Sequence, residues 1–359
     1  MRSHQQLSFI TLLFTLVAPA LHAQRVVVVS GGGDEVAGPA ARCRLHAPFG
    51  IDFDHSGNMF IVEMAVGERV LKVDVRGMLT VVAGTGEKGD KGDGRPAVQA
   101  QFNGMHSFAV GPADDLYIAD TWNNRVRRID AKNGKVFPFA GTGRKGFSGD
   151  GGPASAAEFG NVYCVAFDVR RDNLYLADLD NRRIRSVNLK SGIVTTVAGN
   201  GEKGVPRDGA EATQAPLVDP RAVAVDSQGI LYILERSGHA LRAVDRDGKI
   251  RTVAGTGRKG FDGDGGEALK ASFNEPKHLC VDGNDNVIIA DTDNHVVRKY
   301  LPKENRIIRV VGSGKSGAGG VGGPASAVEL NQPHGVHVDK SGVLYIADSL
   351  NNRVLKIEP

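Results

Sequence analysis

The sequence predicts an all-β fold, a closed six-bladed β-propeller with four antiparallel strands in each blade, and three observations predict it. First, a short apolar segment ends in Asp or Glu at intervals of 56 to 58 residues, at positions 63, 120, 178, 235, 291 and 348. Second, each interval contains stretches of alternating apolar and polar residues, as β-strands do. Third, the two ends of the chain supply complementary parts of one repeat unit.

The strands of one unit are clearest in the first two units. Residues 50–54 form an alternating stretch, residues 55–58 a turn, and residues 59–62 a second β-rich stretch. In the second unit, residues 125–130 and 135–140 predict a third and a fourth strand. Four short antiparallel strands make one propeller blade.

Gly-rich connectors join the fourth strand of one unit to the first strand of the next. The clearest connector begins at Gly141, reaches Ala154 and continues into a predicted helical turn that ends at Phe159. Matching copies begin at Gly84, Gly199, Gly255 and Gly312. Because a propeller carries the chain from the outer edge of one blade to the inner strand of the next, we interpret these glycines as structural turns.

The two ends of the chain predict how the ring closes. The last unit contains only three strands and ends with residues 352–357, whereas residues 25–33 provide a fourth strand and the start of a connector. Pairing the two segments completes the last blade and leaves no long unpaired inner edge. Removing 23 of the 359 residues leaves 336, which is 56 for each of six blades.

Residues 1–23 have the pattern of a signal peptide. Arg2 and His4 precede an apolar run over residues 7–18, and small residues follow up to Ala23, where we expect cleavage. A retained membrane anchor is the alternative, but the run is shorter than the ~20 residues that span a bilayer. The predicted organisation is a signal peptide at 1–23 and a propeller at 24–359, in a secreted or periplasmic protein without a membrane span.

The residues between the second and third strands carry a recurring polar motif. Asp120 and Asp348 each end a second strand, and the sequences Asn-Asn-Arg at 123–125 and 351–353 follow them. This pattern resembles the NHL repeat, and the resemblance covers essentially all of the predicted propeller. We expect these polar residues to be architectural, with Asp or Asn bonded to backbone groups and the Arg five residues after Asp120, Asp178 or Asp348 paired with a carboxylate.

The starts of the inner strands are the predicted site, because they converge on the central channel. Six aligned positions hold dissimilar residues, unlike the uniform positions elsewhere in the repeat, and they are Phe49, His106, Tyr163, Arg221, Lys277 and His334. Concave sites with a few convergent polar groups favour ligands. We therefore expect a non-enzymatic recognition platform that binds a protein, a glycan or a small ligand at this channel mouth.

A metal-dependent lyase or hydrolase is the competing hypothesis. His106 and His334 occupy equivalent places in alternate blades, an arrangement similar to the zinc-binding histidines of the peptidylglycine amidating lyase propeller. The third alternate blade offers Arg221, and a guanidinium does not bind zinc. Residues 262–267 superficially resemble a calcium loop but lack the spacing of an EF-hand. No cofactor is predicted, and zinc or calcium stays an open alternative.

Composition and charge limit the classes of partner that we expect. The net charge is only +3, with acidic and basic residues interspersed, so we expect no nucleic-acid partner. We also expect the protein to be a monomer. Only three cysteines are present, and we interpret Cys164 and Cys280 as small buried residues of inner strands. One face is expected to be weakly basic because the connectors carry Lys88, Arg144, Lys145, Lys203, Arg258 and Lys259.

Overall fold

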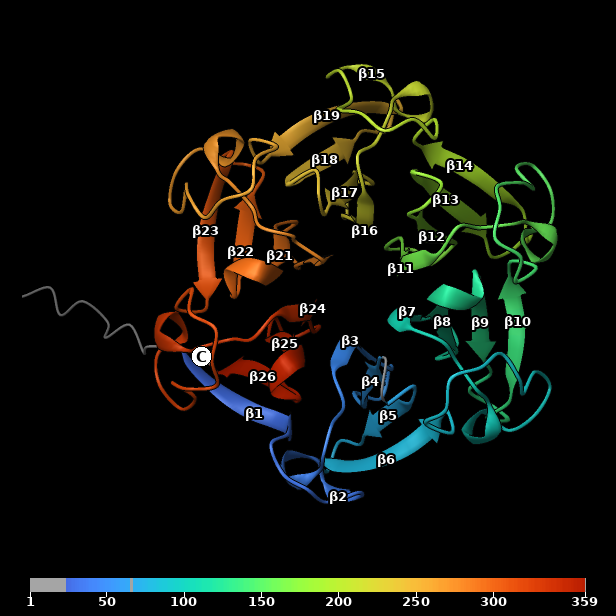
Figure 1. Ribbon diagram of the computed structural model, residues 1–359, viewed down its shortest axis with the longest axis vertical. Coiled ribbons are helices and arrows are strands. Elements are labelled where there is room, and N and C mark those ends of the chain that lie inside the picture. Colours follow the sequence, from blue (N-terminus) through green and yellow to red (C-terminus); the bar gives the residue numbers. More distant parts are fainter. Residues whose placement is uncertain (1–23, 65–66, 359) are drawn as a thin grey trace, which may run out of the picture.

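Six antiparallel sheets surround a central channel in the computed structural model, which describes residues 24–64 and 67–358 (Figure 1). The first strand of each blade lies at the channel and the fourth at the periphery. The predicted signal peptide at 1–23 lies outside the described residues. In the part of the chain that is described, no helix is long and apolar enough to cross a membrane.

The first three blades follow the chain in order. The first contains β3 (Pro48–Phe53), β4 (Met59–Glu63), β5 (Val70–Val73) and β6 (Met78–Ala83), with the short β2 (Gly38–Pro39) beside β6. The second contains β7 (Met105–Val110), β8 (Leu116–Asp120), β9 (Arg125–Ile129) and β10 (Val136–Ala140). The third contains β11 (Val162–Phe167), β12 (Asn173–Asp178), β13 (Arg183–Asn188) and β14 (Val194–Ala198).

The other three blades complete the circle. The fourth contains β16 (Pro220–Val225), β17 (Leu231–Glu235), β18 (Ala240–Val244) and β19 (Lys249–Ala254), with the short β15 (Ala210–Glu211) beside β19. The fifth contains β20 (His278–Val281), β21 (Val287–Asp291), β22 (Val296–Leu301) and β23 (Arg306–Val311). The sixth contains β24 (Pro333–Val338), β25 (Leu344–Asp348), β26 (Arg353–Glu358) and β1 (Arg25–Gly31).

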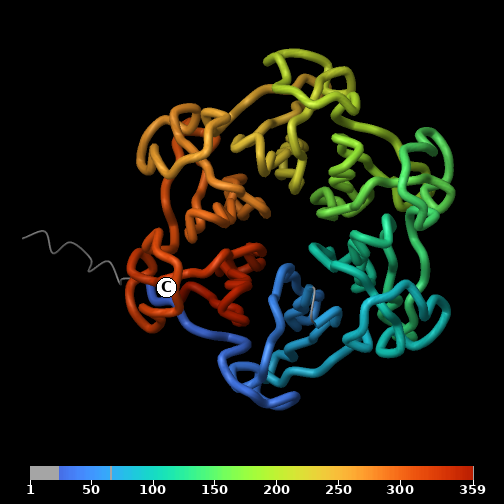
Figure 2. Tube along the Cα trace, in the orientation of Figure 1, coloured from blue at the N-terminus to red at the C-terminus, as the bar shows by residue number. Residues whose placement is uncertain are grey.

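The ring closes as the sequence predicts. β1 pairs antiparallel with β26, so that Val26 lies opposite Ile357 and Val28 opposite Leu355. Figure 2 shows the two ends of the described chain side by side in this blade, the N-terminal segment in blue and the C-terminal segment in red. Val26 is fully buried in the core of the last blade. The N-terminal strand therefore contributes apolar contacts as well as backbone hydrogen bonds.

The long connectors are packed against the blades. Each contains one turn of 3₁₀ helix whose first Ala is buried, and these turns are η1 (Ala40–Arg42), η2 (Ala97–Gln99), η4 (Ala154–Ala156), η5 (Ala212–Gln214), η6 (Ala268–Lys270) and η8 (Ala325–Ala327). A few residues later a large apolar side chain is fully buried, for example Phe102, Phe159 and Phe273. These anchors explain the length of the connectors. The predicted helical turn is present as η4, which ends at Ala156 and not at Phe159.

Three further 3₁₀ turns follow the second strands of three blades. They are η3 (Thr121–Asn123), η7 (Thr292–Asn294) and η9 (Ser349–Asn351). The residue after each turn is left-handed, with φ of 51° at Asn124, 55° at His295 and 51° at Asn352. Asn and His enter this conformation more readily than most side chains, which explains their recurrence here.

Removal of β1 tests the closure of the ring. A chain that begins at Gly32 loses the buried Val26 side chain and leaves β26 with an unpaired edge. We expect its free energy of unfolding to fall by about 3 kcal/mol or more, the worth of one to two buried valines. Calorimetric unfolding beside a control chain that begins at Gln24 measures this, and equal stability of the two chains would contradict the closure.

Candidate functional site

Six buried carboxylates fix the places where the inner strands begin. Each one ends the second strand of a blade, is fully buried, and accepts a hydrogen bond from a backbone N–H of the connector that precedes the inner strand. The donor and acceptor lie 2.6 to 2.8 Å apart in the pairs His46–Glu63, Asn103–Asp120, Gly160–Asp178, Val218–Glu235, Asn274–Asp291 and Asn331–Asp348. The expectation that these acids are architectural is therefore confirmed.

Three arginines, each five residues after Asp120, Asp178 or Asp348, are expected to pair with a carboxylate, and two of them do. Arg353 lies 2.7 Å from Asp348, and Arg125 lies 3.4 Å from Asp120. For Arg183 the expectation is wrong, because its guanidinium donates to the backbone oxygens of Asn181 and Asn200. The fully buried Arg185 lies 3.5 Å from Asp178 instead.

Arg185 belongs to a second recurring set that the sequence interpretation missed. Arg127 and Arg298 occupy the same position, seven residues after the acid, and lie 3.8 Å from Asp120 and 3.5 Å from Asp291. Their guanidinium groups also cover the rings of Phe102 and Phe273. The recurrence of Arg seven residues after four of the six acids, Asp120, Asp178, Glu235 and Asp291, was the signal that could have found them.

The structure brings the predicted mouth residues together at the channel. Phe49, His106, Tyr163, Arg221 and His334 each occupy the unpaired place in a β-bulge at the start of an inner strand. A bulge turns its side chain away from the regular alternation of the strand. Lys277 immediately precedes β20.

The mouth side chains contact one another around the ring. The rings of Phe49 and His334 stack with centroids 4.0 Å apart, and the centroids of His106 and Tyr163 lie 4.4 Å apart. The guanidinium carbon of Arg221 lies 4.3 Å from the centre of the Tyr163 ring. Phe49, His106, Arg221 and His334 are buried, whereas Tyr163 and Lys277 are half-buried. The mouth is thus an aromatic and basic plug with two accessible side chains.

Both mouth histidines are neutral. Nδ1 of His106 lies 2.8 Å from the carbonyl oxygen of Gly104, and Nδ1 of His334 lies 2.9 Å from that of Gln332. Since a carbonyl only accepts, Nδ1 carries the proton in each ring. Burial, aided by the positive charges of Arg221 and Lys277, holds the pKa of both histidines well below the usual value.

Arg221 is a buried cation that has no carboxylate oxygen within 4.0 Å among the described residues. Its Nη1 donates to the backbone oxygen of Tyr163 over 3.3 Å, and its Nε has no hydrogen-bond partner in the part of the chain that the structure describes. Burial lowers the pKa of Arg221 to about 10, so the group keeps its charge at neutral pH. Lys277, at the same mouth, lies 3.7 Å from a carboxylate oxygen of Asp293.

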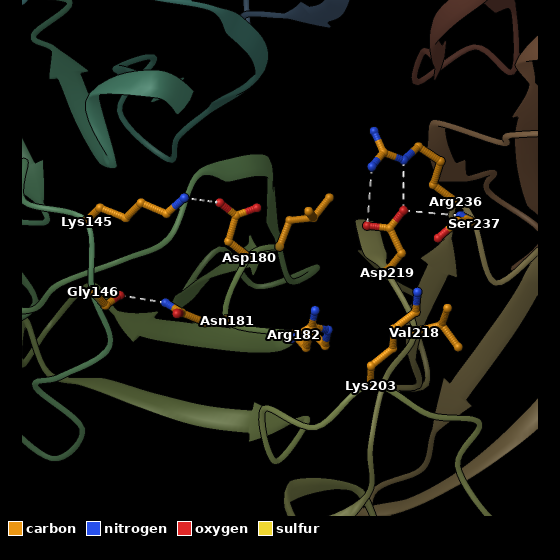
Figure 3. A pocket seen from close by; sticks show the side chains of 11 residues that line it. Lys145, Gly146, Asp180, Asn181, Arg182, Lys203, Val218, Asp219, Arg236 and Ser237 are labelled. Atoms are coloured by element: carbon orange, nitrogen blue, oxygen red, sulfur yellow. Dashed lines mark hydrogen bonds and ion pairs between the residues drawn. The ribbon is translucent and has the colours of Figure 1, made fainter.

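A hollow of about 500 Å³ lies on the connector face between the third and fourth blades (Figure 3). Lys145 pairs with Asp180 over 2.6 Å, and Arg236 pairs with Asp219 over 2.8 Å. The remaining cations of the hollow are Arg182 and Lys203, and neither has a carboxylate partner within 4.0 Å among residues 24–64 and 67–358. Figure 3 shows these two side chains beside the two ion pairs. The hollow adjoins the mouth, because the charges of both Arg236 and Asp219 act on Arg221.

The repeat pattern breaks at this hollow. In the second, fifth and sixth blades a Thr or Ser follows the buried acid, and its hydroxyl donates over 2.6 to 2.8 Å to the backbone oxygen of the first residue of the next inner strand. These residues are Thr121, Thr292 and Ser349. The first, third and fourth blades have Met64, Leu179 and Arg236 there, and the last two line the hollow. Sequence reasoning named Lys145 and Lys203 but missed Arg182 and Arg236, although this break in the repeat could have indicated the place.

The metal hypothesis gains no ligand set from the structure. Among the described residues, no three His, Cys, Asp or Glu side chains lie close enough together to hold a metal ion. His106 and His334 each use Nδ1 for a backbone carbonyl. In the calcium-like segment, the carboxylate of Asp264 lies 2.9 Å from the buried guanidinium of Arg298, so it serves an ion pair.

These features define a closed six-bladed propeller whose blades are held by a buried acid and a polar turn. A family model described as the teneurin NHL domain matches residues 154–261, and one described as the NHL repeat matches residues 330–357. The chain belongs to the NHL-repeat propellers.

Two curated relatives illustrate how far the similarity extends. NHL repeat-containing protein 2 of Homo sapiens is 30% identical over 278 residues, which are 68% of this chain and 37% of that protein. Protein SUPPRESSOR OF QUENCHING 1, chloroplastic, of Arabidopsis thaliana is 27% identical over 274 residues, which are 72% of this chain and 25% of that protein. The chain therefore spans well under half the length of these relatives.

Solved structures share the fold at low identity. An auxiliary nutrient binding protein from Bacteroides thetaiotaomicron has a TM-score of 0.68 at 15% identity. The match covers 93% of this chain and 76% of the chain of that protein. A virginiamycin B lyase from Staphylococcus aureus has a TM-score of 0.57 at 12% identity. The match covers 94% of this chain and 99% of the chain of that protein. At such identities the likeness shows the fold alone.

The neutral histidines predict how stability depends on pH. The unfolded chain binds protons at His106 and His334 below pH ~6.5, whereas the folded chain does not, so folding stability falls as the pH falls. We expect His334→Phe, which keeps the stacking on Phe49, to remove a loss of about 1.4 kcal/mol per pH unit below 6.5.

Urea unfolding of the wild type and the variant at several pH values between 7 and 5 measures the difference. The matched control is Phe49→Leu, which changes the other ring of the stack and removes no titratable group, so it should keep the wild-type dependence on pH. Parallel profiles for the wild type and His334→Phe would refute the neutral assignment.

Proposed function

We propose that this protein is a binding propeller that recognises an anionic ligand on its connector face. One observation supports this most strongly: the hollow between the third and fourth blades contains four cations and two carboxylates, and both carboxylates are already paired. Arg182 and Lys203 are left to meet a carboxylate, sulfate or phosphate group. Such groups can be carried by a protein or by a glycan.

The geometry of the hollow suits recognition of several anionic groups. A guanidinium presents two parallel N–H groups to a carboxylate or sulfate, whereas an ammonium acts as a point charge, so Arg182 would orient the ligand and Lys203 would add attraction. Arg236 is held in place by Asp219. Leu179 and Arg236 replace the hydroxyl residue on the two sides of this hollow, which suits a site added to a scaffold.

The channel mouth extends the proposed site. Lys277 and Tyr163 are the accessible members of the predicted mouth set, and the buried charge of Arg221 lies beside them. A buried cation without an acidic partner is costly, so an anion bound at this edge would be favoured. In this proposal, Phe49, His106 and His334 support the mouth and the accessible edge contacts the ligand.

Charge removal in the hollow tests the proposal. We expect the double variant Arg182→Met, Lys203→Met to bind an oligoglutamate peptide or a sulfated heparin oligosaccharide about tenfold or more weakly, since each charge-assisted hydrogen bond contributes about 1.5 to 3 kcal/mol. Isothermal titration calorimetry with both probes decides which carrier of the anionic groups is preferred.

The control removes the same charge from the opposite face. Lys132 and Lys303 lie exposed in turns between third and fourth strands, and Lys132→Met, Lys303→Met should keep wild-type affinity. An equal loss in this variant, or binding of neither probe by the wild type, contradicts the proposal. Elemental analysis of the purified protein provides a second test. Near-stoichiometric zinc or calcium that is lost when His106 and His334 are replaced with Ala would contradict the proposal and favour the lyase or hydrolase hypothesis.

We also propose that the protein acts outside the cytoplasm, on the strength of the charged, apolar and small residues of positions 1–23. We expect the mature protein to begin at Gln24, which mass spectrometry of the protein purified from the exported fraction would identify. Replacement of Leu12 and Leu13 by Arg should leave the uncleaved chain inside the cell. Normal export of that variant would show that the apolar run is not a signal.

A further inference from the structure

The channel contains a second hollow, of about 440 Å³, at the end away from the connectors. Its lining comes from all six inner strands, β3, β7, β11, β16, β20 and β24, and from turns that follow two of them. None of the six mouth residues lines it. Its volume lies within the range of small-molecule sites.

The mouth plug closes this cavity on the connector side. Stacking of Phe49 on His334 and of Arg221 on Tyr163 fills the start of the channel. The cavity residues lie later in the same strands, and the rim residues Arg171 and Lys340 lie in the turns after β11 and β24. The cavity is therefore a blind pocket that opens on the face opposite the proposed anion site.

Most of the residues that line the cavity are apolar, whereas polar and apolar atoms share its accessible surface about equally. One lining side chain is a fixed hydrogen-bond donor. Leu279, Phe108 and several Val and Ala residues line the cavity. The backbone N–H of Val336 donates to Nδ1 of His278 over 3.4 Å, so the proton of the neutral ring is on Nε2. Burial, then the charges of Arg221 and His337, lowers the pKa of His278 to about 3. No described residue accepts a hydrogen bond from this Nε2.

The rim carries two cations, Arg171 and Lys340. Arg171 and Lys340 come from opposite blades, yet both line this cavity and the neighbouring hollow beside Tyr345. Arg171 donates to the backbone oxygen of Gly111 over 3.0 Å, and within the described chain neither cation has a carboxylate within 4.0 Å.

The acids of the cavity are occupied by the protein itself. Asp52 accepts the backbone N–H of Val110 over 2.7 Å and lies 3.6 Å from His337. Asp168 accepts from the backbone N–H of Asp172 and from the side chain of Asn173, within its own turn. Both carboxylates keep their negative charge, but their hydrogen bonds and the contact with His337 are made within the protein. Arg171 and Lys340 are therefore the charged groups of this opening that can pair with an acid.

We propose that this blind cavity binds a small organic acid with an apolar body. The acid group meets Arg171 and Lys340 at the rim, the apolar body lies among the inner strands, and a ligand oxygen or π-face receives the Nε2–H of His278. This site is independent of the anion site on the connector face, because no residue lines both hollows.

Octanoate and 1-octanol are the probes, because they share the apolar chain and differ in charge. We expect octanoate to bind the wild-type protein and to bind Arg171→Met, Lys340→Met about tenfold or more weakly, while octanol binds both proteins equally. Titration calorimetry gives the affinities, and thermal unfolding shows whether the variant is folded. The control variant Lys132→Met, Lys303→Met removes equal charge from turns on the same face and should keep wild-type affinity.

The histidine provides a readout inside the cavity. In the ¹⁵N-histidine-labelled protein, octanoate should shift the resonances of His278, which is identified by their absence in His278→Gln, and leave those of His106 in place. Octanoate affinity that is unchanged in the rim variant, or His278 resonances that do not move at saturation, overturns the proposal. The variant Arg182→Met, Lys203→Met should still bind octanoate, so the two proposed sites can fail separately.

Discussion

The propeller depends on six buried carboxylates, each of which holds the chain at the point where it enters the next inner strand. A carboxylate away from water is costly, and burial raises the pKa of Asp178 and Asp291 to about 6. Backbone N–H groups, Asn side chains and buried arginines offset this cost, as Asn181 and Arg185 do for Asp178. Because the same contact recurs in all six blades, it explains the fold and does not by itself point to a function.

Function is better sought where the repeat departs from its pattern. The hydroxyl contact made by Thr121, Thr292 and Ser349 ties one blade to the next, and it is replaced by Leu179 and Arg236 on the two sides of the connector-face hollow. The connectors around that hollow are anchored by buried side chains such as Phe159, so its cations are presented by an ordered surface. A preorganised surface loses less entropy when a ligand binds.

The two faces of the ring offer different chemistry because the channel is divided. Aromatic and basic side chains at the starts of the inner strands pack into a plug, and the rest of the channel is a cavity of mixed apolar and polar surface. The connector face is polar and suits an extended anionic partner. The opposite face has a cavity large enough for a small molecule. At its rim lie two cations that have no carboxylate within 4.0 Å among the described residues.

The sequence alone determined the period, the four strands of each blade, the closure by the N-terminal strand and the convergence of Phe49, His106, Tyr163, Arg221, Lys277 and His334. These follow from backbone periodicity, which repeated residues report directly. Only the tertiary structure decided that Arg185 and not Arg183 contacts Asp178, that the mouth is filled, and that Arg182 and Lys203 share a hollow. The filled mouth and the shared hollow depend on side-chain contacts between blades, whose partners lie tens of residues apart and leave no local pattern in the sequence. The choice between Arg183 and Arg185 depends on which side chain of β13 reaches the buried acid.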